Sequence, residues 1–271
     1  MIDLKKKATE LREMTIREIG HLGSGHIGGS MSIIEVLTYL YFKEMNIDPS
    51  NPKMEGRDRF VCSKGHAGPA VYATLAAKGY FPVELLKTLN QGGTKLPSHC
   101  DMNLTPGIDF TTGSLGQGAS AAVGIALGQK LKKEKSFTYV MLGDGESQEG
   151  QVWEAAEVAA SLHLGNLIGF TDFNRLQLDG FTEDIINMDN IDTRWLGFNW
   201  QVKRINGHDF GQIERAVQDA KAETNRPTMI ILDTIKGKGF APGEGKATCH
   251  SMAFNEAEAE EAIKVLEGGL K

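Results

Sequence analysis

Residues 137–174, FTYVMLGDGESQEGQVWEAAEVAASLHLGNLIGFTDFN, decide the fold of this 271-residue chain. The apolar run Phe137–Leu142 predicts a strand that ends at Gly143-Asp144-Gly145. A helix is expected over 150–164, and the apolar residues 167–172 predict the next strand. A strand, a helix and a second strand in this order are typical of a parallel βαβ unit.

The same alternation continues on both sides of this stretch. Downstream, two strands flank a helix that Asp209 caps at its N-terminus: 200–205, 210–223 and 228–234. Upstream, we expect helices over 4–22, 31–45, 67–78, 82–89 and 119–132, a strand over 59–63 and a long loop over 89–118. A last helix is expected over 255–267. The pattern predicts an α/β fold with a doubly wound parallel sheet, whose ligands bind at the carboxyl ends of the strands.

Composition and charge exclude several classes of protein. Hydrophobic residues make up 41% of the chain, enough for a large core. The net charge of -6 and the lack of a basic stripe make nucleic acid and anionic membranes poor candidates as partners. No apolar run has the length of a signal peptide core or of a membrane span. The three cysteines are widely spaced and form no CxxC motif, so we expect a reduced, soluble, cytoplasmic protein.

Two polar residues follow neighbouring strands and indicate a metal site. Asp144 follows the first strand between two glycines, and Asn174 follows the second. A carboxylate, an amide oxygen and a nearby backbone carbonyl are the oxygen donors that Mg²⁺ or Ca²⁺ prefers. The turn after Gly145 also offers N–H groups to a phosphate. Gly-Asp-Gly alone is a common turn, so the metal prediction depends on the pairing with Asn174.

Several further motifs make the chain resemble the thiamine diphosphate-binding domain of transketolases. The central motifs are Gly143-Asp144-Gly145, Glu149-Gly150, Leu164-Gly165-Asn166-Leu167-Ile168 and Asp172-Phe173-Asn174. The others are Ser24-Gly25-His26, Ser63-Lys64-Gly65-His66, Pro97-Ser98-His99, the stretch 112–118 (TGSLGQG) and Ile235-Lys236-Gly237-Lys238-Gly239, followed by His250. They occur in the order of the family and cover nearly the whole chain. The resemblance implies a thiamine diphosphate-binding fold and a thiamine diphosphate cofactor with a divalent cation.

The resemblance also implies roles for individual residues. The metal ligands would be Asp144, Asn174 and the carbonyl of Leu176. The diphosphate would be held by His66, Gly145, Asn174 and His250. The thiazolium and aminopyrimidine side would be lined by Gly113, Ser114 and Leu115. The reacting carbons and sugar hydroxyls would face His26, His66, His99 and His250. Glu149 would lie at a subunit interface.

Some of these positions have simpler interpretations. A single histidine in a loop is more often structural than catalytic, but imidazole can exchange protons near neutral pH. The shared loop context of the four histidines favours catalysis. Residues 113–118 are also compatible with a plain turn into a helix. Lys236 and Lys238 are most simply solvated charges, with a phosphate contact or a mobile loop over 237–245 as the alternative.

The resemblance covers only the first domain of a transketolase. In the family, the glutamate that faces the aminopyrimidine and the arginines that bind sugar phosphates lie on a second, pyrimidine-side domain. We therefore expect residues 1–271 to form one diphosphate-side domain, and a separate C-terminal transketolase subunit to supply the pyrimidine-side domain. The family dimerises with its cofactor at the interface, which implies two copies of each chain.

The resemblance implies ketol transfer in carbohydrate metabolism, with the pentose phosphate pathway as the expected setting. A two-carbon unit would pass from a ketose phosphate to an aldose. Four departures from the family pattern affect the sugar side of the site and leave the substrate open: Ile27, Ser98, Phe173 and the weakly matching segment 247–254 around His250. The alternatives are a split enzyme for a branched or sulfonated sugar, a deoxyxylulose-phosphate synthase-like enzyme and a non-catalytic scaffold subunit.

Overall fold

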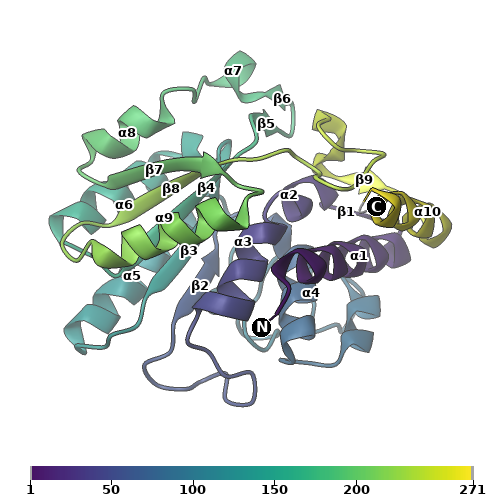
Figure 1. Ribbon diagram of the computed structural model, residues 1–271, viewed down its shortest axis with the longest axis horizontal. Helices are drawn as coiled ribbons and strands as arrows, with labels where there is room; N and C mark the ends of the chain where they lie inside the picture. The colour runs from purple at the N-terminus through teal and green to yellow at the C-terminus, as the bar shows by residue number, and fades with distance from the viewer. Residues whose placement is uncertain (1, 270–271) are drawn as a thin grey trace.

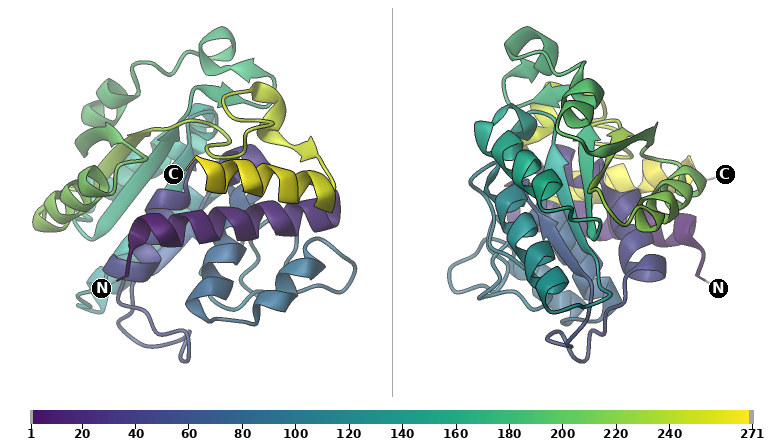
Figure 2. Two further views of the ribbon diagram at one scale, coloured as in Figure 1. Left: turned by 45° about the vertical axis from the view of Figure 1, so that its right-hand side comes forward. Right: turned by 90° about the vertical axis from the view of Figure 1, so that its left-hand side faces the viewer.

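A five-stranded parallel sheet forms the centre of the computed structural model, which describes residues 2–269 (Figure 1). Its strands lie in the order β2 (Arg59–Cys62), β3 (Thr138–Gly143), β4 (Leu167–Phe173), β8 (Thr228–Asp233) and β7 (Gln201–Asn206). Every neighbouring pair is parallel. Helices lie on both faces, as the two turned views show (Figure 2). The predicted doubly wound sheet is confirmed.

Alternating side chains of the strands divide the core between these two faces. In β3, Tyr139 and Met141 belong to one buried cluster, and Val140 and Leu142 belong to the other. Seven consecutive residues of β4 are buried, as expected for a central strand covered on both sides. The first face is covered by α3 (Ile34–Tyr39), α4 (Gly68–Lys78) and α9 (Phe210–Ala222). The second is covered by α5 (Gln117–Leu131), α6 (Gly150–Ser161) and α8 (Ile191–Gly197).

The first and last helices pack side by side and bring two distant histidine segments together. Helix α1 (Leu4–Leu22) ends at Gly23, whose φ of 92° only glycine adopts readily. The chain then forms the two-residue strand β1 (Ser24–Gly25), which pairs antiparallel with β9 (Met252–Ala253) just before α10 (Glu256–Gly268). This ladder places the loop of His26 beside the segment of His250.

The single helix expected over 31–45 is wrong. The structure has α2 (Ile27–Met31), then α3, then a π-helical turn, η1 (Leu40–Glu44). The break lies at Ser32 and Ile33, and the Ser32 hydroxyl donates a hydrogen bond to the Asp172 carboxylate at 2.6 Å. All six residues of α3 are buried, so apolar spacing could not reveal where each helix ends.

Other differences concern short elements. The helix expected over 82–89 is a 3₁₀ segment, η3 (Val83–Thr88). The structure also contains the hairpin of β5 (Leu176–Gln177) and β6 (Gly180–Phe181), followed by α7 (Thr182–Ile185); with α8, these elements were not predicted. Strands of two residues and helices of four to seven leave too little periodicity to detect. Asp209 caps α9 as expected, by accepting from the Gln212 N–H at 3.0 Å.

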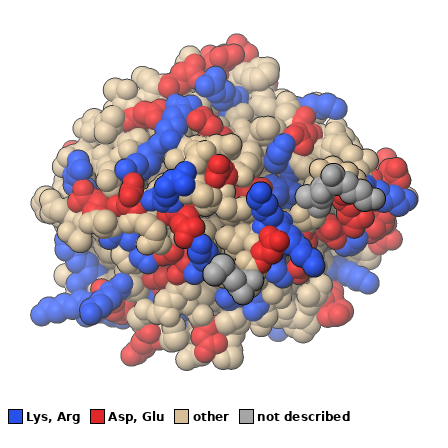
Figure 3. Space-filling model, viewed as in Figure 1, with Lys and Arg blue, Asp and Glu red and all other residues tan. Residues whose placement is uncertain are grey.

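The surface carries charges of both signs. On the face shown in Figure 3, Lys and Arg side chains alternate with Asp and Glu and gather into no broad field of one sign. Within residues 2–269, none of the helices is both long and apolar enough to cross a bilayer.

Candidate functional site

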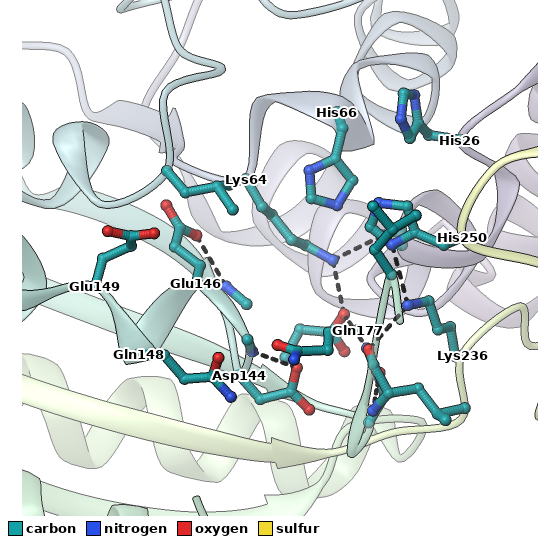
Figure 4. Close-up of a pocket in the computed structure, with 18 of the residues that line it drawn as sticks. His26, Lys64, His66, Asp144, Glu146, Gln148, Glu149, Gln177, Lys236 and His250 are labelled. Atoms are coloured by element: carbon teal, nitrogen blue, oxygen red, sulfur yellow. Dashed lines mark hydrogen bonds and ion pairs between the residues drawn. The ribbon is translucent and has the colours of Figure 1, made fainter. Parts of the chain in front are cut away.

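A cleft of about 360 Å³ opens at the carboxyl end of the sheet (Figure 4). It lies where β2, β3, β4 and β8 end, because the segments that follow these strands supply Lys64, Asp144, Asn174 and Lys236 to its lining. Ligand sites of parallel α/β sheets are expected at this edge. Segments before α2 and after β8 complete the cleft with His26 and His250.

The predicted metal ligands come together in this cleft. Gly143 of β3 pairs with Asp172 of β4, so the two strand ends lie side by side. The Asp144 carboxylate accepts hydrogen bonds from the N–H groups of Gly145, at 2.7 Å, and Arg175. Asp144, Asn174 and Leu176 all line the cleft. Residues that carry a carboxylate, an amide oxygen and a backbone carbonyl therefore line one cleft.

The electrostatics of Asp144 suit a ligand of a cation. Asp144 is buried, and the two N–H groups are its hydrogen-bond partners. Burial, together with the negative charge of Asp172, raises the pKa of Asp144 to about 7. A divalent cation would offset this cost. A carboxylate, an amide oxygen and a backbone carbonyl are hard oxygen donors, which suit magnesium or calcium better than zinc.

Asp172 holds the floor of the cleft together and is not a free metal ligand. Its carboxylate accepts from Ser32, from the Lys64 ammonium at 2.6 Å, from the Asn174 amide at 2.9 Å and from Thr234. Burial alone would raise the pKa of Asp172, but the Lys64 ammonium and these hydrogen bonds hold it below its usual value. The amide bond orients Asn174, whose Oδ1 accepts from the Leu176 N–H at 3.1 Å.

The four predicted histidines form one cluster in the cleft. The ring centre of His26 lies 5.4 Å from that of His66, 5.7 Å from that of His99 and 5.5 Å from that of His250. The ring centres of His66 and His250 are 5.0 Å apart. The structure therefore brings these four side chains together in one cleft. Their individual roles in catalysis stay predictions.

The environment keeps these imidazoles neutral. Burial lowers the pKa of His99, and burial together with nearby positive groups lowers the pKa of His26 and His66. For His250, burial and the Lys236 ammonium lower the pKa to about 4. A neutral imidazole can accept a proton from a hydroxyl group, as ketol chemistry requires.

The segment 113–115 lies at one wall of the cleft. Gly113 and Leu115 line it, whereas Ser114 is exposed and is not among the lining residues. Gly113 has a φ of 148°, and a Cβ at this position would lie 3.1 Å from the His99 ring. Gly145 lies close to the Gln177 side chain, because a Cβ at this position would lie 2.7 Å from the Gln177 Oε1 and 3.0 Å from its Cβ. Glu149 lies at the rim and is exposed.

Two lysines belong to the site although their sequence context predicts no definite role. Lys64 is 2% exposed and donates to the Gly29 carbonyl at 2.7 Å as well as to Asp172. Lys236 is 3% exposed and donates to the Leu176 carbonyl at 2.8 Å, so its interpretation as a solvated charge is wrong. Lys238, in contrast, pairs with Glu244 nearer the surface. The motif Ser63-Lys64-Gly65-His66 was the available signal for Lys64.

Comparisons with known proteins agree with this geometry. Residues 4–268 match the family model for the transketolase, thiamine diphosphate binding domain. The 6-deoxy-6-sulfo-D-fructose transketolase subunit SqwG of Clostridium sp. (strain MSTE9) is 53% identical, over 98% of this chain and 97% of that protein. One subunit of the apulose-4-phosphate transketolase of Phocaeicola vulgatus is 38% identical, over 96% of this chain and 92% of that protein.

Solved structures show the same architecture. The transketolase of Campylobacter jejuni superposes with a TM-score of 0.91 at 31% identity, over 98% of this chain and 43% of that chain. The transketolase of Leishmania mexicana gives a TM-score of 0.88 at 27% identity, over 99% of this chain and 46% of that chain. This chain therefore spans less than half the length of either solved transketolase.

Proposed function

Because the chain belongs to the transketolase family, as a thiamine diphosphate-binding subunit of the split type, we propose that it transfers a two-carbon ketol unit from a ketose to an aldose together with a second subunit. One observation carries this proposal. The oxygen donors at the ends of β3 and β4 lie in the same cleft as four neutral histidines.

The oxygen donors would hold the cofactor through a divalent cation. Asp144, the Asn174 amide oxygen and the Leu176 carbonyl would bind Mg²⁺, and Ca²⁺ suits the same ligands. The turn at Gly145, with His66 and His250, would bind the diphosphate. When bound, thiamine diphosphate supplies a carbanion and an electron sink for cleavage of the carbon–carbon bond.

The histidines of the cleft would handle the protons of the sugar. Cleavage of a ketose requires removal of a hydroxyl proton, and addition to an aldehyde requires protonation of its oxygen. A neutral imidazole of His26 or His99, whose ring centres are 5.7 Å apart, can accept the hydroxyl proton, and the imidazolium formed in this way can return that proton to the oxygen of the acceptor aldehyde. His250, whose Nδ1 lies 3.2 Å from the Lys236 ammonium, and His66, whose ring centre lies 5.0 Å from that of His250, would share in orienting the cofactor and substrate.

A second chain is needed to complete the site. Among the described residues that line the cleft, the basic side chains besides the histidines are Lys64 and Lys236. Both ammonium groups already bind groups of this chain. The group that recognises the anionic end of the sugar, and the carboxylate that faces the aminopyrimidine, would therefore come from a pyrimidine-side subunit. Two copies of each chain would form the assembly.

We propose a sulfonated ketose as the donor. Support comes from the 53% identity over nearly the whole chain to a subunit named for 6-deoxy-6-sulfo-D-fructose. Removal of carbons 1 and 2 from that sugar leaves a four-carbon aldose with the sulfonate on its last carbon. A ketose phosphate is the alternative donor. The match to the transketolase family favours either sugar over a deoxyxylulose-phosphate synthase-like reaction or a scaffold role.

The test is reconstitution with the pyrimidine-side subunit. The mixed subunits, with thiamine diphosphate and Mg²⁺, are expected to transfer the ketol unit from 6-deoxy-6-sulfofructose to an aldose phosphate, with the four-carbon sulfonate detected by mass spectrometry. Fructose 6-phosphate serves as the competing donor. A mixture that binds the cofactor and transfers from neither sugar contradicts the enzyme proposal. A preference for the phosphate contradicts only the choice of donor.

The cytoplasmic location, the magnesium ion and a place in the pentose phosphate pathway stay predictions from the sequence. A sulfonated donor would place the reaction in the breakdown of sulfosugars instead of the pentose phosphate pathway.

A further inference from the structure

Glu146 is a buried carboxylate for which the sequence predicts no role. It begins the short 3₁₀ turn η4 (Glu146–Gln148) after the Gly-Asp-Gly motif, and it is 3% exposed. Its Oε1 accepts from the Ser63 hydroxyl and from the Gly116 N–H at 2.9 Å. Its Oε2 accepts from the Gly143 N–H at 3.0 Å. The side chain lies in the wall of the cleft (Figure 4).

The three donors come from the three chain segments that carry the cofactor side of the cleft. Ser63 lies three residues before His66, Gly116 directly follows the segment 113–115, and Gly143 directly precedes Asp144. The Glu146 carboxylate therefore connects the loop of His66, the segment 113–115 and the loop of Asp144, and it adds to the pairing of β2 with β3 and to the hydrogen bond between Thr112 and Cys62.

The segment 113–115 depends most on this carboxylate. Its preceding residue, Thr112, is fixed because the Thr112 hydroxyl donates to the Cys62 carbonyl at 2.7 Å. Its following residue, Gly116, is fixed by the hydrogen bond to Glu146. Gly113 and Gly116 both have positive φ values, 148° and 83°, where glycine is least restricted. Without the bond at Gly116, the end of the segment next to α5 loses its hydrogen bond to the Glu146 side chain and keeps only the backbone bonds that start the helix.

Burial of the Glu146 carboxylate lowers the stability of the fold, which indicates that this side chain has a specific structural role. Burial raises the pKa of Glu146, and the Ser63 hydroxyl and the two N–H groups oppose that shift. A buried carboxylate whose partners are neutral donors costs stability that an apolar side chain of similar size would not cost. In return, the Ser63 hydroxyl and the N–H groups of Gly116 and Gly143 are held in fixed positions, because each donates to a defined oxygen of the carboxylate.

We propose that Glu146 is a positioning residue, which holds the segments of His66, of 113–115 and of Asp144 in register for the cofactor. The inference rests on the proposed function. Glu146 acts through its three hydrogen bonds and does not touch the reacting atoms.

The substitution Glu146→Gln tests this inference with little change of shape. A glutamine offers one oxygen and one NH₂ group, so at least one of the three donors faces another donor. The dissociation constant of thiamine diphosphate, measured by calorimetry on the subunit pair with Mg²⁺, is expected to rise ~10- to 100-fold, the range found for groups that orient metal ligands. With saturating cofactor, kcat is expected to change less than ~3-fold, because the reacting groups are unchanged.

A second readout needs no cofactor. Hydrogen exchange by mass spectrometry on the chain alone is expected to show faster exchange over 113–118 in Glu146→Gln. The matched control is Glu261→Gln on α10, whose side chain is 72% exposed and far from the cleft. It should match the wild type in both measurements. If Glu146→Gln does not fold, Ser63→Ala removes one of the three donors without a change of charge, and a ~3- to 10-fold rise in the dissociation constant is expected.

The outcomes separate this inference from the proposed function. Wild-type affinity for thiamine diphosphate and wild-type exchange in Glu146→Gln, or in Ser63→Ala where Glu146→Gln does not fold, would overturn the positioning role. A loss of kcat at saturating cofactor as large as the loss of affinity would also overturn it. A wild-type pair that binds no thiamine diphosphate would instead refute the proposed function.

Discussion

Asp144 is a central ligand of the proposed metal site, and its negative charge is unfavourable in this buried position. Burial and the charge of Asp172 raise the pKa of Asp144 to about 7, and two backbone N–H groups and the charge of Lys236 offset only part of this shift. Substitution Asp144→Asn keeps the size of the side chain and removes the charge that would bind the cation. We expect Mg²⁺-dependent binding of thiamine diphosphate, followed by calorimetry, to weaken by at least ~100-fold, more than the loss of a group that only orients a ligand.

The control for this prediction is Asp179→Asn. Asp179 also lines the cleft, but its side chain is exposed at the rim. We expect little change in metal or cofactor affinity from this variant. Equal losses of cofactor affinity in Asp144→Asn and Asp179→Asn would show that the loss comes from the total charge of the cleft and not from removal of a metal ligand.

The neutral state of His250 predicts a pH dependence of stability. Its pKa is about 4 in the folded chain against an ordinary value of 6.5, so between these pH values the unfolded chain binds a proton that the folded chain does not. Stability due to this group is therefore present above about pH 6.5 and is lost as the pH falls toward 4. Urea unfolding of the cofactor-free chain at several pH values measures the dependence.

The variant His250→Gln isolates this group. We expect the free energy of unfolding to fall less steeply between pH 6.5 and about 4 than in the wild type. The slope does not vanish, because the pKa of His66 is lowered in the same direction. Asp144, with its raised pKa, acts in the opposite direction in both proteins and cancels in the comparison. Identical slopes would show that His250 carries an ordinary pKa.

At the scale of elements, the sequence revealed the long, regular parts of the fold. The strands β3 and β4 and the helix between them follow from apolar runs with glycine at their ends, and the adjacency of Asp144 and Asn174 follows from the parallel order. The break between α2 and α3 could not be predicted, because Ser32 leaves the helix for Asp172, a contact 140 residues away in the sequence. Lys64 and Lys236 were missed for the same reason: their buried partners lie on distant segments.

The packing of α5 against β2 gives a prediction at the same scale. A Cβ on Gly118, near the start of α5, would lie 2.6 Å from the Cα of Ser63, a backbone atom that cannot move freely. Gly118→Ala is therefore expected to destabilise the chain by ~1–3 kcal/mol. Urea denaturation with tryptophan fluorescence measures the change in midpoint.

The control lies in the same helix. A Cβ on Gly124 would meet nothing within 4 Å, so Gly124→Ala should leave the stability unchanged or raise it by up to ~1 kcal/mol through helix propensity. A similar loss of stability in Gly118→Ala and Gly124→Ala would contradict this explanation. It would mean that any added methyl group destabilises α5, whether or not it lies close to Ser63.

At the scale of the whole molecule, the chain provides one wall of an open site. The cleft contains the proposed ligands for the cation and the diphosphate, together with four histidines, while Glu149 and Leu178 at its rim are exposed. The solved transketolases, of which this chain spans less than half, contain a further portion that this chain does not match. A cofactor held between two subunits couples cofactor binding to the association of the two chains.

That coupling can be measured from both directions. If the pyrimidine-side subunit makes favourable contacts with the bound cofactor, this chain binds thiamine diphosphate more tightly when the partner is present. Because the two equilibria are linked, the cofactor then tightens the association of the two chains by the same factor per site. We expect a factor of at least ~100, about 3 kcal/mol, in both measurements. Calorimetry with and without the partner gives one value, and sedimentation with and without cofactor and Mg²⁺ gives the other. Affinity for thiamine diphosphate that is already maximal in the isolated chain would place the whole cofactor site on this chain and contradict the shared site.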